Sequence, residues 1–270
     1  MPELPEVETV VRGLRTPLVG RTIHDVWYDS PKVIHTPAPT EFVDRIKGQT
    51  FRAIKRRAKY IVCELDQDIL AVHLKMTGRL FTWAGEDMPD KWVHFRLRLD
   101  NNQYLCFSDS RRFGRVFLSN DFAKIAPDLG PEPLEDEFTA AVLGERLRGR
   151  HRAIKPLLLE QSFVAGVGNI YADEALHRAG IHPLRPADEL TNEEIIRLHR
   201  TIRAVLNAGI EYEGASISWY RKPDGTRGES QNHFYAYDRE GLPCLKCRQP
   251  IQKIRVAQRG THFCPTCQPF

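Results

Sequence analysis

Hydrophobic residues near the amino terminus recur with the period of an α-helix. Four apolar residues occupy positions i, i+3, i+4 and i+7, which places them on one face of a helix. These residues are Val7, Val10, Val11 and Leu14. Pro5 stands near the first helical position and acidic residues fill the first turn, and both features favour a helix start. The pattern predicts an amphipathic helix that begins near residue 5.

The pattern changes to the period of a β-strand between about residues 20 and 120. In the stretch HFRLRL, the apolar residues Phe95, Leu97 and Leu99 alternate with polar ones, and the turn sequence DNNQ follows. Such alternation is typical of a strand with one buried face. Several strands of this kind with turns between them predict a β-sandwich.

A segment rich in Pro and acidic residues, APDLGPEPLEDE at residues 126–137, separates the strands from a region with helical periodicity. There, TNEEIIRLHRTIRAVL begins with Thr191 and Glu194, which form a capping-box pattern. Residues 224–244 are rich in Gly, Asp, Asn and Ser, and we expect a mobile loop there. A length of 270 residues agrees with two domains and a small appendage.

Four of the six cysteines form the pattern C-x2-C, a gap of sixteen residues, and C-x2-C. They are Cys244, Cys247, Cys264 and Cys267. Each C-x2-C turn brings two thiolates together, so the spacing is typical of a zinc ribbon. Disulfides are the alternative, although they are rare in cytoplasmic proteins. Four protein ligands leave no open position on the metal, so we expect one structural Zn²⁺ and no organic cofactor.

Composition and charge narrow the class of protein. The chain is 41% hydrophobic and 27% charged, as in an ordinary soluble protein. It lacks an apolar run of roughly 18 to 20 residues and its start is acidic, so we expect neither a membrane span nor a signal peptide, and a cytoplasmic location. The net charge is only +4, but basic residues cluster at 45–60, 110–115 and 146–155. These clusters are either solvated faces or a surface for a polyanion such as nucleic acid.

Pro2 and Glu3 precede the predicted first helix. A small residue after Met1 permits removal of the initiator methionine, which leaves Pro2 with a free secondary amine at the positive end of the helix dipole. Such an amine can act as a nucleophile. The alternative is that this stretch only initiates the helix, and the pattern alone leaves both readings open.

Three further residues have two readings each. Asn169, after GVG, either only caps a helix or also stands where the N–H groups and dipole of the helix receive a phosphate, and both roles can hold together. Phe113, beside paired arginines, is either a core residue or a wedge between bases. Arg259 stands between two short predicted strands and is either a solvated turn residue or a phosphate ligand.

The motifs together resemble one family. MPELPEVET, RRAKY, HLKMTG, RRFG, AIKP, GVGNIYADE and AQRGTHFCPTCQ stand in the order and at about the spacing of bacterial formamidopyrimidine-DNA glycosylases, across essentially the whole chain. The resemblance implies an α+β multidomain fold. Its parts are an N-terminal β-sandwich with an N-terminal helix, a central helix-two-turns-helix bundle and a C-terminal four-Cys zinc finger hairpin, with DNA held between the halves.

The expected domain boundaries follow from this resemblance. We expect a catalytic β-sandwich domain at 1–130 and a linker with a first helix at 131–150. The helix-two-turns-helix domain, with a lesion-covering loop, is expected at 151–236. The zinc finger is expected at 237–270.

The resemblance also implies an activity, that of a bifunctional DNA glycosylase (a hydrolase of the N-glycosidic bond) and AP lyase of base excision repair. Such an enzyme removes 8-oxoguanine and formamidopyrimidines from damaged double-stranded DNA through a Schiff base on Pro2, followed by β,δ-elimination. Glu3 is expected to act as general acid and base, and Glu6 to orient the terminal segment. The expected state is a monomer in the bacterial cytoplasm, associated with the nucleoid.

The remaining site residues are carried over by motif. The first group matches family positions that contact phosphates around the extruded nucleotide. Lys59 belongs to this group and is also expected to be catalytic, with Pro2, Glu3 and Glu6. The second group fills the gap left in the duplex, and a single lysine lies near the lesion pocket. The first group is Lys59, His73, Asn169 and Arg259, the second is Met76, Arg111 and Phe113, and the lysine is Lys155.

One region departs from the family pattern, in the segment that we expect to cover the base. Ser230 stands where an aromatic residue is usual, and Asp238 stands where a glycine is usual. Lesion preference therefore stays open. Two alternatives remain: an endonuclease VIII-like glycosylase for oxidised pyrimidines, against which MPELPEVET and RRFG argue, and a non-catalytic zinc DNA-binding protein, against which the intact amino-terminal residues argue.

Overall fold

The computed structural model describes residues 1–270 as two compact units. The first unit consists of Met1–Pro127 and Glu213–Glu229, and the second consists of Asp128–Tyr212 and Ser230–Phe270. The segment 213–229, which lies inside the expected central domain, therefore packs with the amino-terminal part of the chain. No helix combines the length and the apolar character needed to cross a membrane.

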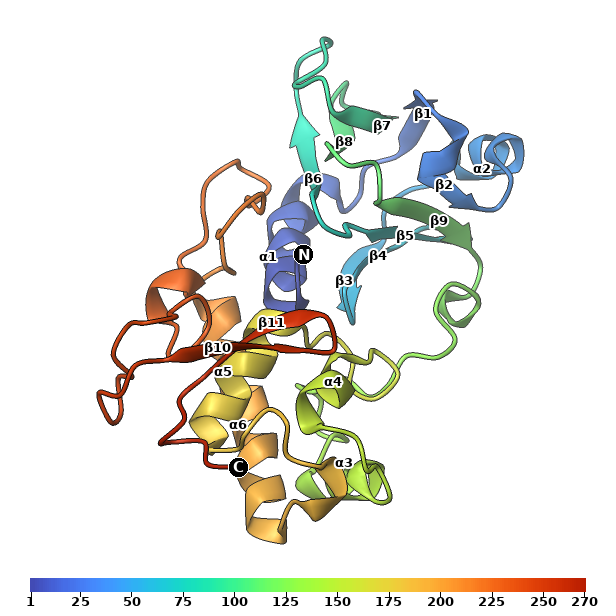
Figure 1. Cartoon of the computed structure of the whole chain (residues 1–270). Coiled ribbons are helices and arrows are strands. Elements are labelled where there is room, and N and C mark those ends of the chain that lie inside the picture. Colours follow the sequence, from blue (N-terminus) through green and yellow to red (C-terminus); the bar gives the residue numbers. More distant parts are fainter. The chain divides into compact units, whose positions relative to one another are not determined.

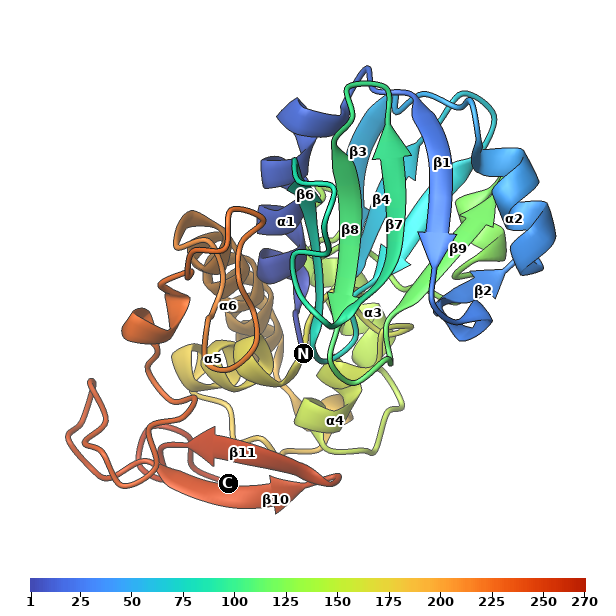
Figure 2. The same cartoon turned by 90° about the horizontal axis from the view of Figure 1, so that it is seen from above.

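The first unit begins with the predicted helix, α1 (Leu4–Leu18). Its start is a capping box, in which the Glu3 side chain accepts from a backbone N–H in the first turn and the Glu6 side chain accepts from the N–H of Glu3. The predicted apolar face is fully buried. Helix α1 contacts β3, β4 and β6, and Figure 2 shows it beside the strands. The helix prediction is confirmed.

Two sheets form the body of this unit and confirm the expected β-sandwich region. The first sheet has the order β1-β7-β8-β6, all antiparallel, and the second has the order β2-β9-β5-β4-β3, in which only β2 and β9 are parallel. Short helices flank the sheets. The strands are β1 (Ile23–Tyr28), β2 (Ile34–Thr36), β3 (Ala53–Arg57), β4 (Tyr60–Glu64), β5 (Ile69–His73), β6 (Gly78–Trp83), β7 (Val93–Leu99), β8 (Tyr104–Asp109) and β9 (Arg115–Ser119), and the helices are η1 (Pro31–Val33), α2 (Pro39–Ile46) and η2 (Phe122–Lys124).

The second unit is helical with a terminal hairpin. Helix α5 packs against α4, α6 and β11, and α3 packs against α6 (Figure 1). Helix α6 begins with the predicted capping box of Thr191 and Glu194. The elements are α3 (Ala140–Leu147), α4 (Ile154–Leu159), α5 (Asn169–Ala179), η3 (Ala187–Glu189), α6 (Asn192–Glu211), η4 (Ser230–His233) and the antiparallel strands β10 (Gln252–Val256) and β11 (Arg259–Phe263).

Candidate functional site

The start of α1 is held by the carboxylate of Glu6. The backbone N–H of Glu3 donates to Glu6 Oε2 at 2.8 Å, and the N–H of Ala215 donates to Glu6 Oε1 at 2.7 Å. Glu3 and Glu6 are both buried, with 3% and 1% of their surface exposed. One side chain therefore joins the amino terminus to a segment more than 200 residues away in sequence.

That segment, 213–229, has the geometry of a fixed loop. Gly214 has a φ of +81°, and a Cβ there would lie 2.9 Å from both Glu6 Cγ and the Tyr220 ring, so only glycine fits. The Tyr220 hydroxyl donates to the carbonyl of Glu213, and Ser216 donates to the carbonyl of Tyr220. Burial, with a contribution from the Glu6 charge, raises the pKa of Tyr220, so its hydroxyl stays protonated and can donate.

Sequence reasoning missed this segment, although a signal was present. The stretch ISWYRKPDG combines aromatic and basic residues with turn residues, a mixture that occurs on nucleic-acid-binding surfaces. In the structure, Ile217 and Trp219 are exposed, Trp219 to 58%.

The segment after it differs from the expected mobile loop. Ser230–His233 forms a 3₁₀ helix, and the N–H groups of Tyr235, Ala236 and Tyr237 all donate to the buried carboxylate of Glu174 at 2.8–3.0 Å. Burial raises the pKa of Glu174, and the three N–H groups partly offset the shift. The expectation of a mobile connection is therefore wrong for 230–237. Composition alone does not show that the N–H groups of this segment donate to the buried carboxylate of Glu174.

Lys59 and His73 lie close to each other in the first unit. Lys59 occupies the tight β3–β4 connection and is buried, and Tyr60, the residue after it, pairs with His73 across β4 and β5. The N–H of Lys75 donates to His73 Nδ1 at 3.0 Å. Burial, followed by the charges of Lys75 and Lys59, lowers the pKa of His73 to about 3. The neutral ring therefore carries its proton on Nε2, which can act as a donor.

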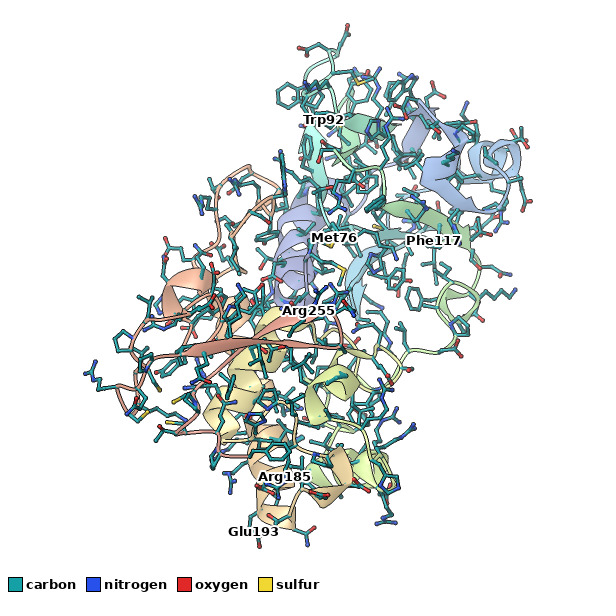
Figure 3. The ribbon with its side chains drawn as sticks, viewed as in Figure 1. Met76, Trp92, Phe117, Arg185, Glu193 and Arg255 are labelled. Carbon is teal, nitrogen blue, oxygen red and sulfur yellow. The ribbon has the colours of Figure 1, made fainter.

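Two connections of the first unit expose the residues expected to fill a gap in a duplex. Phe113 is 47% exposed in the β8–β9 connection and Met76 is 37% exposed in the β5–β6 connection. Figure 3 labels Met76. The Arg111 guanidinium lies 4.6 Å from the centre of the Phe113 ring. The reading of Phe113 as a core residue is therefore wrong, since nearly half of its side chain is in solvent.

Asn169 does not cap α5. The N-cap residue is Gly168, and Asn169 is the first helical residue, whose Nδ2 donates to the carbonyl of Gly260 at 3.0 Å. The capping interpretation is wrong because the two glycines before Asn169 let the helix begin one residue earlier. Asn169 instead joins the amino end of α5 to the carbonyl of Gly260 in β11. The turn between β10 and β11 is formed by Ala257 and Gln258, so Arg259 begins β11 and does not lie between the strands as predicted.

Lys155 is fully buried beside the same hairpin. Its Nζ lies 2.6 Å from Asp173 Oδ1 and donates to Thr261 Oγ1 at 2.7 Å and to the Gly260 carbonyl at 3.2 Å. An ammonium has three N–H donors. These contacts make Lys155 a cross-link between α4, α5 and β11.

The four cysteines predicted as zinc ligands come together. Their Sγ atoms all lie within 4.8 Å of one another, with 3.9 Å from Cys244 to Cys267 and 3.4 Å from Cys247 to Cys264. These separations are too long for disulfides. A tetrahedral site with Zn–S bonds of about 2.3 Å requires sulfur atoms about 3.8 Å apart, so the four thiolates fit a structural zinc ion.

Helix α5 also supports this cysteine cluster. His177 Nε2 lies 3.4 Å from Cys244 Sγ, and the Lys246 ammonium donates to the carbonyls of His177 and Arg178 at the carboxyl end of α5. Burial, followed by the charges of Lys246 and Arg178, lowers the pKa of His177 to about 4. A neutral imidazole with its proton on Nε2 can donate to a thiolate, a common outer contact of metal ligands.

Models of protein families match nearly the whole chain. The formamidopyrimidine-DNA glycosylase N-terminal domain matches residues 1–116, the formamidopyrimidine-DNA glycosylase H2TH domain matches 129–221, and the zinc finger found in FPG and IleRS matches 241–269.

Individual proteins match over their full lengths. The formamidopyrimidine-DNA glycosylases of Chloroflexus aurantiacus and Roseiflexus sp. are 50% and 48% identical over 272 residues, covering 99% of this chain and 98% and 100% of the relatives. The structure of Lactococcus lactis Fpg in complex with an abasic site containing DNA superposes with a TM-score of 0.92 at 37% identity, covering 99% of this chain and 100% of that one. The MutM (Fpg) protein from Thermus thermophilus gives a TM-score of 0.89 at 41% identity, covering 99% of this chain and 98% of that one.

Proposed function

The chain belongs to the formamidopyrimidine-DNA glycosylase family and is a DNA glycosylase of base excision repair, and from this premise we propose that it excises oxidised purines from damaged double-stranded DNA with Pro2 as the nucleophile. The same covalent intermediate then supports AP lyase activity. The proposed catalytic residues are Pro2, Glu3, Glu6 and Lys59.

The observation that carries this proposal is the pair of hydrogen bonds to Glu6. The N–H that donates to Glu6 Oε2 belongs to the peptide bond between Pro2 and Glu3, and the other carboxylate oxygen accepts from Ala215. The orientation of the residue after Pro2 is therefore set by a buried carboxylate. A positioned nucleophile needs less reorganisation to reach its target.

The first step forms the covalent bond. Once Met1 is removed, the Pro2 nitrogen is a secondary amine at the amino end of α1, where the helix dipole disfavours its protonated form. Its lone pair attacks C1′ of the damaged nucleotide, and the base leaves with the electron pair of the broken bond to C1′. The proton that the Pro2 nitrogen then loses neutralises the departing base. Glu3 donates its carboxyl proton to O4′, the C1′–O4′ bond breaks, and the nitrogen lone pair forms an iminium ion with C1′.

The iminium ion then supports strand cleavage. Its positive charge draws electrons toward C1′, so a C2′ proton passes to the Glu3 carboxylate and the 3′ phosphate departs in a β-elimination. A second elimination releases the 5′ phosphate. Water hydrolyses the remaining iminium bond and frees Pro2.

Each unit contributes residues with the chemistry to bind DNA phosphates. In the first unit these are Lys59 and His73. The lowered pKa of His73 leaves its imidazole neutral, with an Nε2–H that can donate to a phosphate. In the second unit they are Asn169, which donates to the carbonyl of Gly260, and Arg259, which directly precedes Gly260 at the start of β11. We assign Lys155 an indirect part near the lesion, because its Nζ is occupied by Asp173, Thr261 and Gly260.

Extraction of a base from the duplex costs a few kcal/mol of stacking and pairing. The exposed side chains of Met76 and Phe113 support a role in filling the gap, and the guanidinium over the Phe113 ring supports contact of Arg111 with the orphaned base.

For coverage of the extracted base we favour residues 216–227, because their segment contacts Glu6 and exposes Trp219. Ser230 and Asp238 lie in the second unit, where Ser230 is buried and Asp238 is exposed, and we assign Ser230 to packing there.

The remaining features complete the proposal. A zinc ion bound by the four cysteines cross-links the hairpin and takes no part in the reaction. We retain the boundaries 1–130, 131–150, 151–236 and 237–270, with 213–229 acting together with the first domain. We further propose a monomer in the bacterial cytoplasm, associated with the nucleoid; the bacterial relatives support this location.

Reductive trapping tests the nucleophile and the substrate together. The full chain with zinc is incubated with a duplex that contains 8-oxoguanine opposite cytosine, in the presence of borohydride, and the adduct is mapped by peptide mass spectrometry. We expect a covalent adduct on Pro2. Trapping on a lysine, or a blocked amino-terminal nitrogen in active protein, would overturn the mechanism. Faster turnover on a duplex with oxidised thymine would favour the pyrimidine-specific alternative.

A further inference from the structure

We propose that Asp29 is a positioning residue for the turn that carries Arg111 and Phe113, acting through Arg112 and held in place by His94. The inference deepens the proposed function, since it rests on the insertion of Arg111 and Phe113 into the duplex. Asp29 directly follows β1, 83 residues from Arg112 in sequence.

The two ends of the turn are held by Asp109. Its Oδ1 accepts from the N–H of Arg111 at 3.2 Å and from the Thr77 hydroxyl, and its Oδ2 accepts from the N–H of Gly114 at 2.7 Å. A Cβ at position 114 would clash with the Phe107 ring. The backbone of the turn therefore lies close against β8 at both ends.

The middle of the turn is strained. The N–H of Arg112 donates to the Asp109 carbonyl at 3.1 Å and its carbonyl accepts from Arg115 Nη1 at 3.0 Å, whereas its side chain is held by a different group. Arg112 has a φ of +57°, a conformation that costs an arginine free energy unless surrounding contacts stabilise it. Its Nη2 donates to Asp29 Oδ2 at 2.9 Å. Arg111 and Phe113 are the two neighbours of Arg112, so the direction of their side chains depends on this backbone conformation.

Asp29 is itself held by a buried ring. His94 lies at an irregularity of β7, where the pairing with β8 shifts between Val93 and Phe95, and such bulges redirect side chains. Its Nδ1 lies 2.7 Å from Asp29 Oδ2, and the N–H of Asp29 donates to the His94 carbonyl at 3.2 Å. The imidazole is 5% exposed and the carboxylate is 25% exposed. A carboxylate fixed in this way loses little further freedom when it binds Arg112, so the entropy cost of the pair falls mainly on the arginine side chain, which is 58% exposed.

A cavity of about 220 Å³ lies beside these groups. On this side the turn therefore lacks the dense apolar packing that would otherwise fix it, and polar contacts determine its position. Among the lining residues are Asp29, His94, Phe107, Asp109, Arg112 and Gly114.

The experiment compares Asp29→Asn, Arg112→Gln and the double variant with Asp25→Asn as the matched control. Asp25 lies on β1 and pairs with Lys47 at 2.8 Å, with both side chains about half exposed. Two measurements are made on the full chain with zinc: the single-turnover rate of 8-oxoguanine excision, and the fluorescence of 2-aminopurine placed next to the lesion, which reports insertion through unstacking. The yield of adduct trapped on preformed abasic DNA reports that each variant is folded.

We expect Asp29→Asn and Arg112→Gln each to slow excision by about fivefold and to reduce the fluorescence change, with no further loss in the double variant. Arg112→Lys, which keeps a cation within reach of Asp29, should restore part of the fluorescence change. Asp25→Asn should behave like the wild type.

Phe113→Ala distinguishes a failure of the proposed insertion by Phe113 from a failure of the proposed positioning role of Asp29. If it leaves the fluorescence change intact, the proposed insertion by Phe113 is wrong. If it removes that change while Asp29→Asn matches Asp25→Asn, insertion stands and the positioning role of Asp29 is overturned. Additive effects of Asp29→Asn and Arg112→Gln would likewise overturn it.

Discussion

The Lys155 ammonium lies 2.6 Å from the Asp173 carboxylate, and neither side chain is exposed to solvent. The pair connects α4 to α5, and the lysine also donates to Thr261 and to the Gly260 carbonyl in the hairpin. Asn169, at the amino end of α5, donates to the same Gly260 carbonyl, so α4, α5 and β11 form one connected arrangement.

Asp173→Asn should destabilise the second unit by about 3–5 kcal/mol, because it leaves a buried ammonium without its counterion. Denaturant-induced unfolding measures the change. The double variant Lys155→Met with Asp173→Leu should recover much of the loss, since no charge is left buried. Glu64→Gln, which removes an exposed pair with Lys55, is the control and should hardly move the transition. A small effect of Asp173→Asn would contradict the importance of the buried pair.

Glu6→Gln should slow formation of the trapped adduct by about 10- to 100-fold, the equivalent of one hydrogen bond to a charged group. The N–H groups of Glu3 and Ala215 donate to different oxygens of the carboxylate, and an amide replaces one of these oxygens by an NH2 donor, so one N–H would face another donor. Single-turnover borohydride trapping measures the rate. Glu41→Gln, an exposed partner of Arg45, should keep the wild-type rate, and an equal rate for Glu6→Gln would argue against the orienting role.

His73 should make stability depend on pH in the acidic range. Burial lowers its pKa to about 3 in the folded protein, against about 6.5 in the unfolded chain. Below pH 6.5 the unfolded chain binds a proton that the folded chain does not, so the free energy of unfolding falls by up to about 1.4 kcal/mol per pH unit until about pH 3. Above pH 7, His73 is neutral in both the folded and the unfolded chain, so no stability is lost through its titration.

Urea denaturation at pH 7.5 and 5.0 measures this dependence. His73→Gln should lose less stability between the two pH values than the wild type does. His24→Gln, at an exposed position of β1, serves as the control and should follow the wild type. Identical losses in all three proteins would show that His73 titrates normally in the folded state.

His177→Phe should weaken zinc binding by about 10- to 100-fold, the usual effect of removing an outer contact of a metal ligand. The reason is the loss of the Nε2 donor 3.4 Å from Cys244 Sγ. Transfer of zinc to a chromophoric chelator measures the release rate. His151→Phe changes an exposed histidine of the same unit and should release zinc at the wild-type rate; equal rates for both variants would contradict the role of His177.

Several elements follow from the sequence because their signals are local. The apolar period of residues 5–14 and the acidic first turn predict α1, and the alternation of Phe95, Leu97 and Leu99 predicts β7. Thr191 and Glu194 predict the start of α6. The spacing of the four cysteines predicts their cluster, because each C-x2-C turn supplies two ligands and two such turns complete a tetrahedral zinc site.

Other features became visible only in the folded chain, because they depend on contacts between residues far apart in sequence. Glu6 meets Ala215 across 209 positions, and Lys155 meets Thr261 across 106. Periodicity and composition predict which face of a helix or strand is buried. They do not predict which N–H group from a distant part of the sequence donates a hydrogen bond to a buried carboxylate. The sequence alone therefore determined α1, β7, the start of α6 and the metal ligands, whose signals are local. Tertiary packing decided that segment 213–229 joins the first unit and that Glu174 fixes the next segment.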